Sequence, residues 1–232
     1  MALLTNGNLS AKILKSNVAN KGYLTYIMYL APYKLSGYNV CSSASPGCIG
    51  GCLNISGRGR MNSVQQARLK RTKYFFEDRT NFIRDLYAEI RKFVAKCRKL
   101  GLKPALRLNG TSDIMWEQVL PQLFVDFPEI QFYDYTKIYK RMVRFLNGEL
   151  PANYHLTFSL SEINFEQSLD IAKNGGNVAV VFRNKGISSQ WLGIPLHNAD
   201  ETDLRFLDKP GFQGLYAKGK MKFDTTNFVV EN

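Results

Sequence analysis

Three of the four cysteines in this chain of 232 residues fall within one short stretch that is rich in glycine and serine. Cys41, Cys48 and Cys52 follow the spacing C-x6-C-x3-C, and Gly47, Gly50 and Gly51 lie among them. A closed zinc site needs four nitrogen or sulfur ligands. Three thiolates from one loop instead suit an iron–sulfur cluster that leaves one iron open to a small ligand. We therefore expect a cluster of the 4Fe–4S type, with zinc or three unmetallated cysteines as alternatives.

The fourth cysteine has a different setting. Cys97 belongs to an apolar stripe in which Phe82, Leu86, Ile90 and Val94 recur every four residues. Such a stripe is the buried face of a helix, and cysteine is among the residues most often buried. We interpret Cys97 as a core residue rather than a metal ligand.

Positive charge is concentrated directly after the cysteines. The net charge is +12, and residues 58–103 hold fourteen Lys and Arg against four Asp and Glu. Such a basic segment favours nucleic acid or a nucleotide as partner, although a solvated helix face would have the same composition. The residues that we expect to contact an anion or nucleic acid are Arg58, Arg60, Arg68, Lys70, Arg71 and Lys73.

The elements that must position these groups follow an alternating pattern. A strand over residues 22–32 precedes the cysteine loop, and a helix over 63–99 follows it, with a break expected at 77–81. Strands and helices then alternate between residues 103 and 184, with a helix expected over 111–128. This alternation is typical of a parallel sheet with crossover helices. We predict an α/β fold, a complete or partial β/α (TIM-like) barrel with the cysteine loop after its first strand. An open doubly wound sheet is the alternative.

We expect a single domain over residues 1–232, since folds of this class often reach this length undivided. Its successive parts are the first strand and cysteine loop (1–57), the basic helical segment (58–103), the β/α units (104–190) and a tail (191–232). The tail is irregular, with strand-like GLYAKGKM and NFVVEN.

Polar residues collect where the predicted strands end, which is the edge at which ligands bind in β/α folds. The turn after one strand supplies four candidate cofactor-binding residues: Asn109, Gly110, Thr111 and Ser112. The candidate catalytic residues are Asp113, Asp134 and Lys137. Purely structural roles are the alternative, with Asp113 as a helix cap and Asp134 paired with Lys137.

Several classes of protein are disfavoured by what the sequence lacks. It has no dinucleotide-binding GxGxxG loop, no Walker phosphate loop, no HExxH and no GxSxG motif. No apolar run reaches the ~18 residues that cross a bilayer, so we expect no membrane partner. The N-terminal residues lack the pattern of a signal peptide. We expect a cytoplasmic protein, and the sequence predicts no oligomeric state.

The motifs GYLTYIMYLAP, NVCSSASPGCIGGCLN, LRLNGTSDIMWE, YDYTK, FSLSE, TDLRFLD and GLYAKGKM occur in this order. Together they resemble a family encoded by bacteriophages and mobile elements, labelled gene product 88-like, which implies residence in the host cytoplasm. A weaker likeness is to radical S-adenosylmethionine enzymes, which place a three-cysteine loop after the first strand of a partial barrel. Their usual spacing is C-x3-C-x2-C. That likeness implies S-adenosylmethionine as a cofactor, bound beside the turn LRLNGTSD.

These observations lead to two functional hypotheses and a third possibility. The first is an iron–sulfur β/α-barrel enzyme that acts on a nucleotide or nucleic acid, with radical S-adenosylmethionine chemistry as one form. The second is a metal-stabilised nucleic-acid-binding protein without catalysis. Binding to a host protein is a third possibility, which the sequence neither supports nor excludes.

Overall fold

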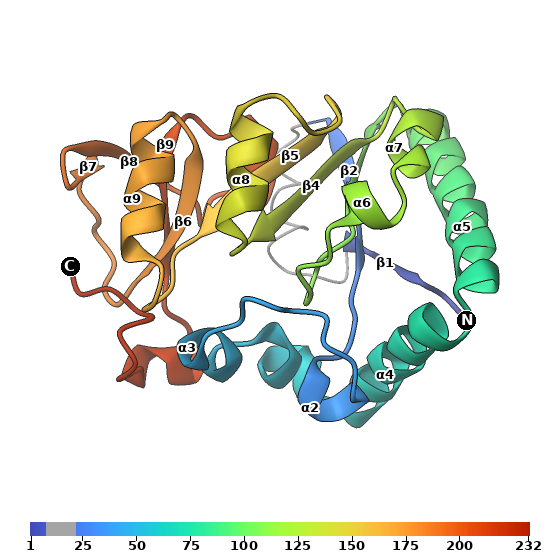
Figure 1. Ribbon diagram of the computed structural model, residues 1–232, viewed down its shortest axis with the longest axis horizontal. Helices are drawn as coiled ribbons and strands as arrows, with labels where there is room; N and C mark the ends of the chain where they lie inside the picture. The colour runs from blue at the N-terminus through green and yellow to red at the C-terminus, as the bar shows by residue number, and fades with distance from the viewer. Residues whose placement is uncertain (8–21) are drawn as a thin grey trace.

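A mostly parallel β-sheet forms the centre of the α/β fold seen in the computed structural model (Figure 1). The model describes residues 1–7 and 22–232. Within them the sheet has nine strands in the order β1-β2-β3-β4-β5-β6-β9-β8-β7. Only the pairs β1–β2 and β7–β8 are antiparallel. The strands are β1 (Leu4–Asn6), β2 (Tyr23–Met28), β3 (Lys103–Arg107), β4 (Gln131–Thr136), β5 (Tyr154–Ser159), β6 (Asn177–Phe182), β7 (Gln190–Trp191), β8 (Ile194–Asn198) and β9 (Gly211–Tyr216).

The strands from β2 to β6 follow one another in chain order without a reversal. Each parallel pair needs a crossover connection, and helices supply these connections. They are α4 (Asn62–Glu77), α5 (Arg79–Leu100), α6 (Trp116–Val119), α7 (Gln122–Asp126), α8 (Tyr139–Leu146) and α9 (Phe165–Lys173). The prediction of an α/β fold is confirmed. Because the strands are parallel, the carboxyl ends of β2 to β6 and of β9 meet at one edge of the sheet.

The long basic helix is divided where the sequence predicted a break. Asp78 separates α4 from α5, and its carboxylate accepts a hydrogen bond from Asn81 N at 3.4 Å. Gly101 ends α5 in the left-handed conformation, with φ of 66°. The predicted apolar stripe is buried, and Cys97 lies within it, which confirms Cys97 as a core residue.

The helix predicted over 111–128 was wrong at its start and in its middle. Asn109 Oδ1 accepts hydrogen bonds from Ser112 Oγ and Ile114 N, which holds the residues before α6 in a non-helical turn. Side chains that bond nearby backbone groups compete with helix formation in this way. Pro121 has no backbone N–H, and it lies between the separate helices α6 and α7.

The tail predicted as irregular over 191–232 supplies two parallel strands, so that expectation was wrong in part. β9 lies between β6 and β8, and Val178 pairs with Phe212. The segment GFQGLY is poor in β-branched residues, so the sequence indicated only its last residues, within the strand-like GLYAKGKM. Gly211 is needed at its start, because its φ is +122° and a Cβ there would lie 2.5 Å from the Pro195 carbonyl oxygen.

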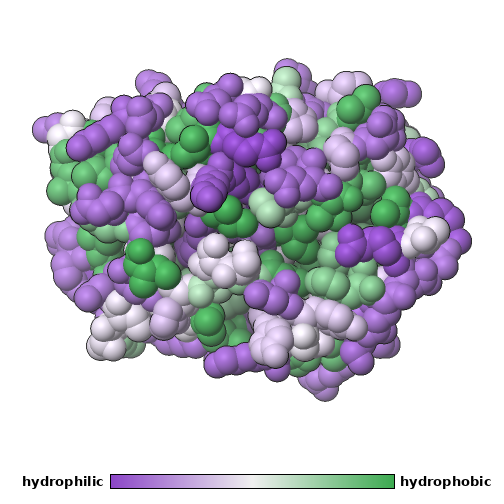
Figure 2. All heavy atoms as spheres, viewed as in Figure 1, coloured by the Kyte–Doolittle hydropathy of each residue, from purple (hydrophilic) through white to green (hydrophobic). Residues whose placement is uncertain are grey.

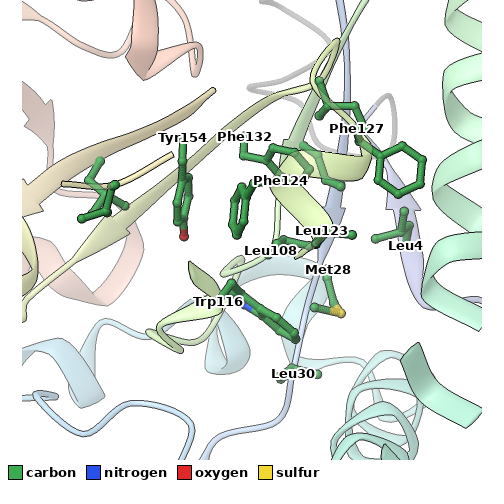
Figure 3. Packing of buried hydrophobic residues seen from close by; sticks show 14 of the residues in the cluster. Leu4, Met28, Leu30, Leu108, Trp116, Leu123, Phe124, Phe127, Phe132 and Tyr154 are labelled. Carbon is green, nitrogen blue, oxygen red and sulfur yellow. The ribbon is translucent and has the colours of Figure 1, made fainter. Parts of the chain in front are cut away.

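The helices cover one face of the sheet through a continuous aromatic and aliphatic core (Figure 3). The ring of Phe124 packs against Phe132 at 4.7 Å and against Tyr154 at 4.8 Å between centroids. Neighbouring residues on a strand point to opposite faces. Tyr133 accordingly belongs to a second, smaller cluster with Ala105 and Leu204. The segment around Leu204 therefore covers the opposite face.

The surface carries both hydrophobic and hydrophilic residues. On the face in Figure 2, hydrophobic residues occur in separate groups among hydrophilic ones. Among the described residues, none of the helices combines the length and apolar character that a membrane span requires.

Candidate functional site

The cysteine loop is built from short helical turns that fix two of its sulfur atoms. Helix α3 (Pro46–Gly50) carries Cys48, and Ser45 caps it by accepting a hydrogen bond from Cys48 N at 3.3 Å. A 3-10 turn begins directly after Cys52, whose Sγ accepts a hydrogen bond from Asn54 N at 3.4 Å. Cys41 Sγ lies 3.6 Å from the carbonyl oxygen of Thr111. The loop is therefore tied to the turn that follows β3.

The C-terminal segment packs against the glycines of this loop. A Cβ on Gly47 would lie 2.3 Å from Phe228 Cβ, and one on Gly51 would lie 3.0 Å from Met221 Sδ. Figure 1 shows this C-terminal segment, in red, beside α3. Glycine is required at position 47 by this close approach, and the two segments together form one wall.

A pocket of about 820 Å³ opens between the cysteine loop and the carboxyl ends of the parallel strands. Pockets that bind small molecules have this size. The groups that could do chemistry in its lining are Cys41, Cys48, Cys52, Arg60, Arg107, Asn109, Gly110, Thr111, Ser112, Asp113, Thr136, Lys137, Ser159, Asp200, Asp203, Lys218 and Lys220. The structure thus brings the three predicted cysteines together with all four predicted cofactor-binding residues and two of the three predicted catalytic ones.

Two of the thiols in this pocket, those of Cys41 and Cys48, are hard to ionise. Burial raises the pKa of Cys41 to about 12, and the nearby Asp113 carboxylate and the other two cysteines add to the effect. Burial also raises the pKa of Cys48, against the lowering influence of Lys137. Thiols of this kind keep their protons unless a positively charged partner takes the place of those protons.

The four predicted cofactor-binding residues form a turn that is held by its own side chains. Asn109 Oδ1 accepts a hydrogen bond from Trp116 Nε1 at 3.2 Å, in addition to those from Ser112 and Ile114. Thr111 Oγ1 donates to the carbonyl oxygen of Leu30 at 2.6 Å. These bonds stiffen the turn at the pocket wall.

Asp113 lies in the pocket wall and anchors a buried ion-pair network. Its Oδ1 lies 2.9 Å from Arg141 Nη1, and its Oδ2 accepts a hydrogen bond from Lys137 N at 2.8 Å. Arg141 also binds Glu117 at 2.7 Å. Burial raises the pKa of Asp113, while the Arg141 charge opposes that rise. Asp113 therefore does not cap α6, and its carboxylate is held in a fixed orientation.

Asp134 does not belong to the pocket, which argues against the catalytic role that the sequence suggested. Its side chain is fully buried, and it accepts hydrogen bonds from Asn109 N at 2.8 Å and Tyr154 Oη at 2.9 Å. Residues alternate between the two faces along β4, so Asp134 points away from the face that bears Tyr135, which lines the pocket. Asp134 supports the Asn109 turn from behind.

The basic residues separate into two groups. Arg58 and Arg60 are exposed, and so are Lys70 and Lys73 on α4. Arg68 is buried, and its Nη1 donates to Asn54 Oδ1 at 3.0 Å. Arg71 donates to the carbonyl oxygen of Ala2 at 2.8 Å. Arg68 and Arg71 thus hold the cysteine loop and the N-terminal segment, and their guanidinium groups are not free for nucleic acid.

The sequence analysis missed several residues of the site. Arg107 Nη1 and Asp203 Oδ2 form a buried ion pair of 2.9 Å at the pocket. An arginine within the apolar run PALRL was the available signal, because a buried charge needs a partner. Arg141, Glu117, Met221 and Phe228 gave no comparable signal, because their roles depend on contacts between distant segments.

In residues 1–7 and 22–232, no group of three or more His, Cys, Asp or Glu side chains is arranged to hold a metal ion. The prediction of a metal at the three cysteines is therefore not confirmed, although all three line one pocket. It stays a prediction.

Comparison with known proteins gives one family. The model described as gene product 88 matches residues 2–232. The comparisons found no matching curated protein and no matching solved structure. They do not show the likeness to radical S-adenosylmethionine enzymes. The resemblance drawn from the ordered motifs is confirmed over nearly the whole chain, which belongs to the phage-type gene product 88 family.

Proposed function

We propose that the pocket holds an iron–sulfur cluster of the 4Fe–4S type, ligated by Cys41, Cys48 and Cys52. One observation carries this proposal: the three thiols line the same pocket as the carboxyl ends of the parallel strands. Such a cluster supplies an iron with an open coordination position, which binds a small ligand or exchanges an electron with it. Zinc with a fourth, external ligand is the alternative.

The chemistry of the donor set fits a cluster. The three sulfurs influence one another electrostatically, so they lie within one local site.

We also infer that the sheet forms a partial β/α barrel. Support comes from the parallel strands β2 to β6 and β9, which are neighbours in the sheet in their chain order. The order reverses only near one edge, where β8 and β7 lie beyond β9, whereas a doubly wound sheet reverses at a switch point between its two halves. In β/α barrels the active site lies at the carboxyl ends of the strands, which is where the cysteine pocket lies.

The proposed activity is an enzyme reaction on a nucleotide or nucleic acid, carried out in the cytoplasm of the host. Arg60 in the pocket wall and the neighbouring Arg58 would bind phosphate oxygens. Asp113, fixed by Arg141, would orient the substrate or accept a proton from it. The turn Asn109–Ser112 would contact a ligand of the open iron, and S-adenosylmethionine is the ligand that the radical-enzyme likeness implies.

Metal analysis of protein purified without oxygen tests the cluster. We expect a brown protein with broad visible absorption, and iron and acid-labile sulfide in comparable amounts. Alanine at Cys41, Cys48 or Cys52 should remove both. Cys97→Ala is the matched control and should keep them, since Cys97 is buried in the core. A colourless wild-type protein with stoichiometric zinc would overturn the proposal.

A nucleic-acid-binding protein without catalysis is the second candidate. The exposed Arg58, Arg60, Lys70 and Lys73 favour it, because they lie on the cysteine loop and on the helix that follows. In that case the cysteine loop would have a purely structural role. Binding of single-stranded DNA by all three single cysteine variants after they have lost iron, combined with no redox activity in the wild type, would support this candidate.

A further inference from the structure

Lys137 follows β4 and projects its ammonium group into the wall of the cysteine pocket. Lys137 Nζ lies 2.5 Å from Ser159 Oγ, 3.3 Å from the Ser159 carbonyl oxygen and 3.5 Å from the Leu160 carbonyl oxygen. An ammonium group has three N–H donors, so these acceptors occupy all of them. The charge is therefore held in one place.

This ammonium forms no ion pair with a carboxylate of the described residues, since its hydrogen-bond acceptors are a hydroxyl and two carbonyl groups. Two carboxylates that act on this charge, those of Asp113 and Glu162, form their hydrogen bonds and ion pairs with other groups. Asp113 binds Arg141 at 2.9 Å, and Glu162 accepts hydrogen bonds from Ser45 Oγ and Gly47 N. Asp113 and Glu162 stabilise the charge only in part, because burial still lowers the pKa of Lys137, and a cation withdrawn from water is costly without sufficient negative charge near it.

A cluster held by the three cysteines would supply further negative charge. Burial lowers the pKa of Lys137, and Cys48 is the neighbour that most opposes this effect. Asp113, Glu162 and Cys41 act in the same direction more weakly. The aromatic ring of Phe228 lies 5.3 Å from Nζ and helps to separate the ammonium group from water. Charges interact more strongly in such a water-poor setting.

We propose that Lys137 is a positioning residue that acts as the fixed counter-charge of the cluster and raises its reduction potential. This inference rests on the proposed function, because it takes the cysteine pocket as the cluster site. In the reaction considered, one electron passes from an external low-potential donor to the cluster, and no proton moves. A nearby positive charge stabilises the more negative, reduced form. This role replaces the catalytic role expected for Lys137, since all three of its N–H groups are engaged.

The test compares midpoint potentials of the full-length protein, measured anaerobically with dithionite as the electron donor. Iron per chain is measured in each sample. Lys137→Gln removes the charge and should shift the potential to a more negative value. Lys137→Arg keeps the charge and should stay close to wild type. Lys140→Gln is the matched control, because Lys140 is exposed on α8, and it should give no shift.

A second variant changes the charge in the opposite sense. Glu162→Gln removes a negative charge that influences both Lys137 and Cys48 electrostatically. It should shift the reduction potential of the cluster to a less negative value. If Lys137→Gln fails to hold iron, Glu162→Gln and Lys137→Arg decide the question. Full iron with an unchanged potential in Lys137→Gln, or no shift in Glu162→Gln, contradicts the counter-charge. Absence of iron from the wild type would overturn the proposed function itself, and this inference with it.

Discussion

Glu162 Oε1 accepts a hydrogen bond from Gly47 N at 2.7 Å across 115 residues of sequence. Its Oε2 accepts a second one from Ser45 Oγ at 2.8 Å. Through these two bonds, the residues that follow β5 hold the first turn of α3, which carries Cys48.

Removal of this contact should weaken metal binding. Glu162→Ala frees the turn that orients Cys48. We therefore expect the affinity for iron to fall by about 10-fold or more, as for other groups that support metal ligands. Glu162→Gln keeps a side-chain oxygen for Gly47 N and should retain most of the iron. The measurement is iron per chain after graded exposure to a chelator. Glu166→Ala, on the exposed surface of α9, is the control. Equal iron loss in Glu166→Ala and Glu162→Ala would refute the role.

The contact between the cysteine loop and the C-terminal segment can be tested with two glycines of α3. A Cβ at Gly47 would meet Phe228 Cβ at 2.3 Å and Thr226 Oγ1 at 2.4 Å, whereas Gly50 has open space around it. Overpacking of this kind costs about 1–3 kcal/mol. We expect Gly47→Ala to lower the free energy of unfolding by that amount in urea denaturation. Gly50→Ala should leave it unchanged or raise it slightly. Equal effects of the two substitutions would show that the contact is not tight.

Arg141 should be among the most sensitive positions in the chain. Its side chain is fully buried and binds Asp113, Glu117 and Tyr154 Oη. Arg141→Met leaves two buried carboxylates without their cation, which typically costs about 3–5 kcal/mol. Thermal or urea unfolding measures the loss. Arg144→Gln lies one turn further along α8 and breaks only an exposed pair with Glu149, so it should be nearly neutral. A stable Arg141→Met protein would mean that the network is dispensable.

The stability of the protein should depend on pH through Asp134. Burial raises its folded-state pKa to about 6, against the opposing effects of Arg107 and of hydrogen bonds, whereas an unfolded aspartate titrates near ~3.9. Between these values the folded protein binds more protons than the unfolded chain, so the free energy of unfolding falls as the pH rises. The contribution is present below about pH 4 and lost by about pH 6 to 7, and it amounts to about 3 kcal/mol.

Asp134→Asn isolates this contribution, because asparagine does not titrate. We expect the difference in unfolding free energy, wild type minus variant, to fall as the pH is raised through this window. Urea denaturation at several pH values from 4 to 7 gives the difference directly. A difference that stays constant with pH would mean that Asp134 titrates normally.

Nucleic-acid binding through α4 predicts a specific dependence on charge. If Lys70 and Lys73 contact phosphates, the double variant Lys70→Gln/Lys73→Gln should weaken binding of single-stranded DNA and reduce the salt slope by about 1.4. Lys173→Gln/Lys209→Gln removes the same charge at exposed positions near the amino ends of β6 and β9, and it should have little effect. Equal losses in the two double variants would indicate only non-specific attraction.

Most of the elements that position the site could be predicted from the sequence, because they depend on local patterns. The stripe through Phe82, Leu86 and Ile90 predicted the long helix, and the polar residues around Asp78 predicted its break. The alternation of apolar strands with helices gave the edge at which Asn109 and Lys137 meet the cysteines. These features follow from periodicity and from the geometry of parallel sheets.

The remaining features could not be predicted, because they depend on contacts between distant residues. Asp134 and Lys137 appeared equivalent in the motif YDYTK, but strand alternation places Asp134 behind the wall, whereas Lys137 lines the pocket. Arg68 appeared to be one of several surface cations, but it is buried against Asn54. The start of β9 was missed, because Gly211 is required by close packing against the Pro195 carbonyl oxygen and contributes no strand propensity.

The pocket wall that Met221 and Phe228 provide has a consequence for biosynthesis. The ribosome makes the three cysteines early, whereas the residues that cover Gly47 and Gly51 are made much later. Until that segment has emerged and docked, the nascent thiols lack one side of their enclosure and are open to oxidants and to stray metal ions. Any loading machinery would therefore have its widest access to the sulfurs while translation is still in progress.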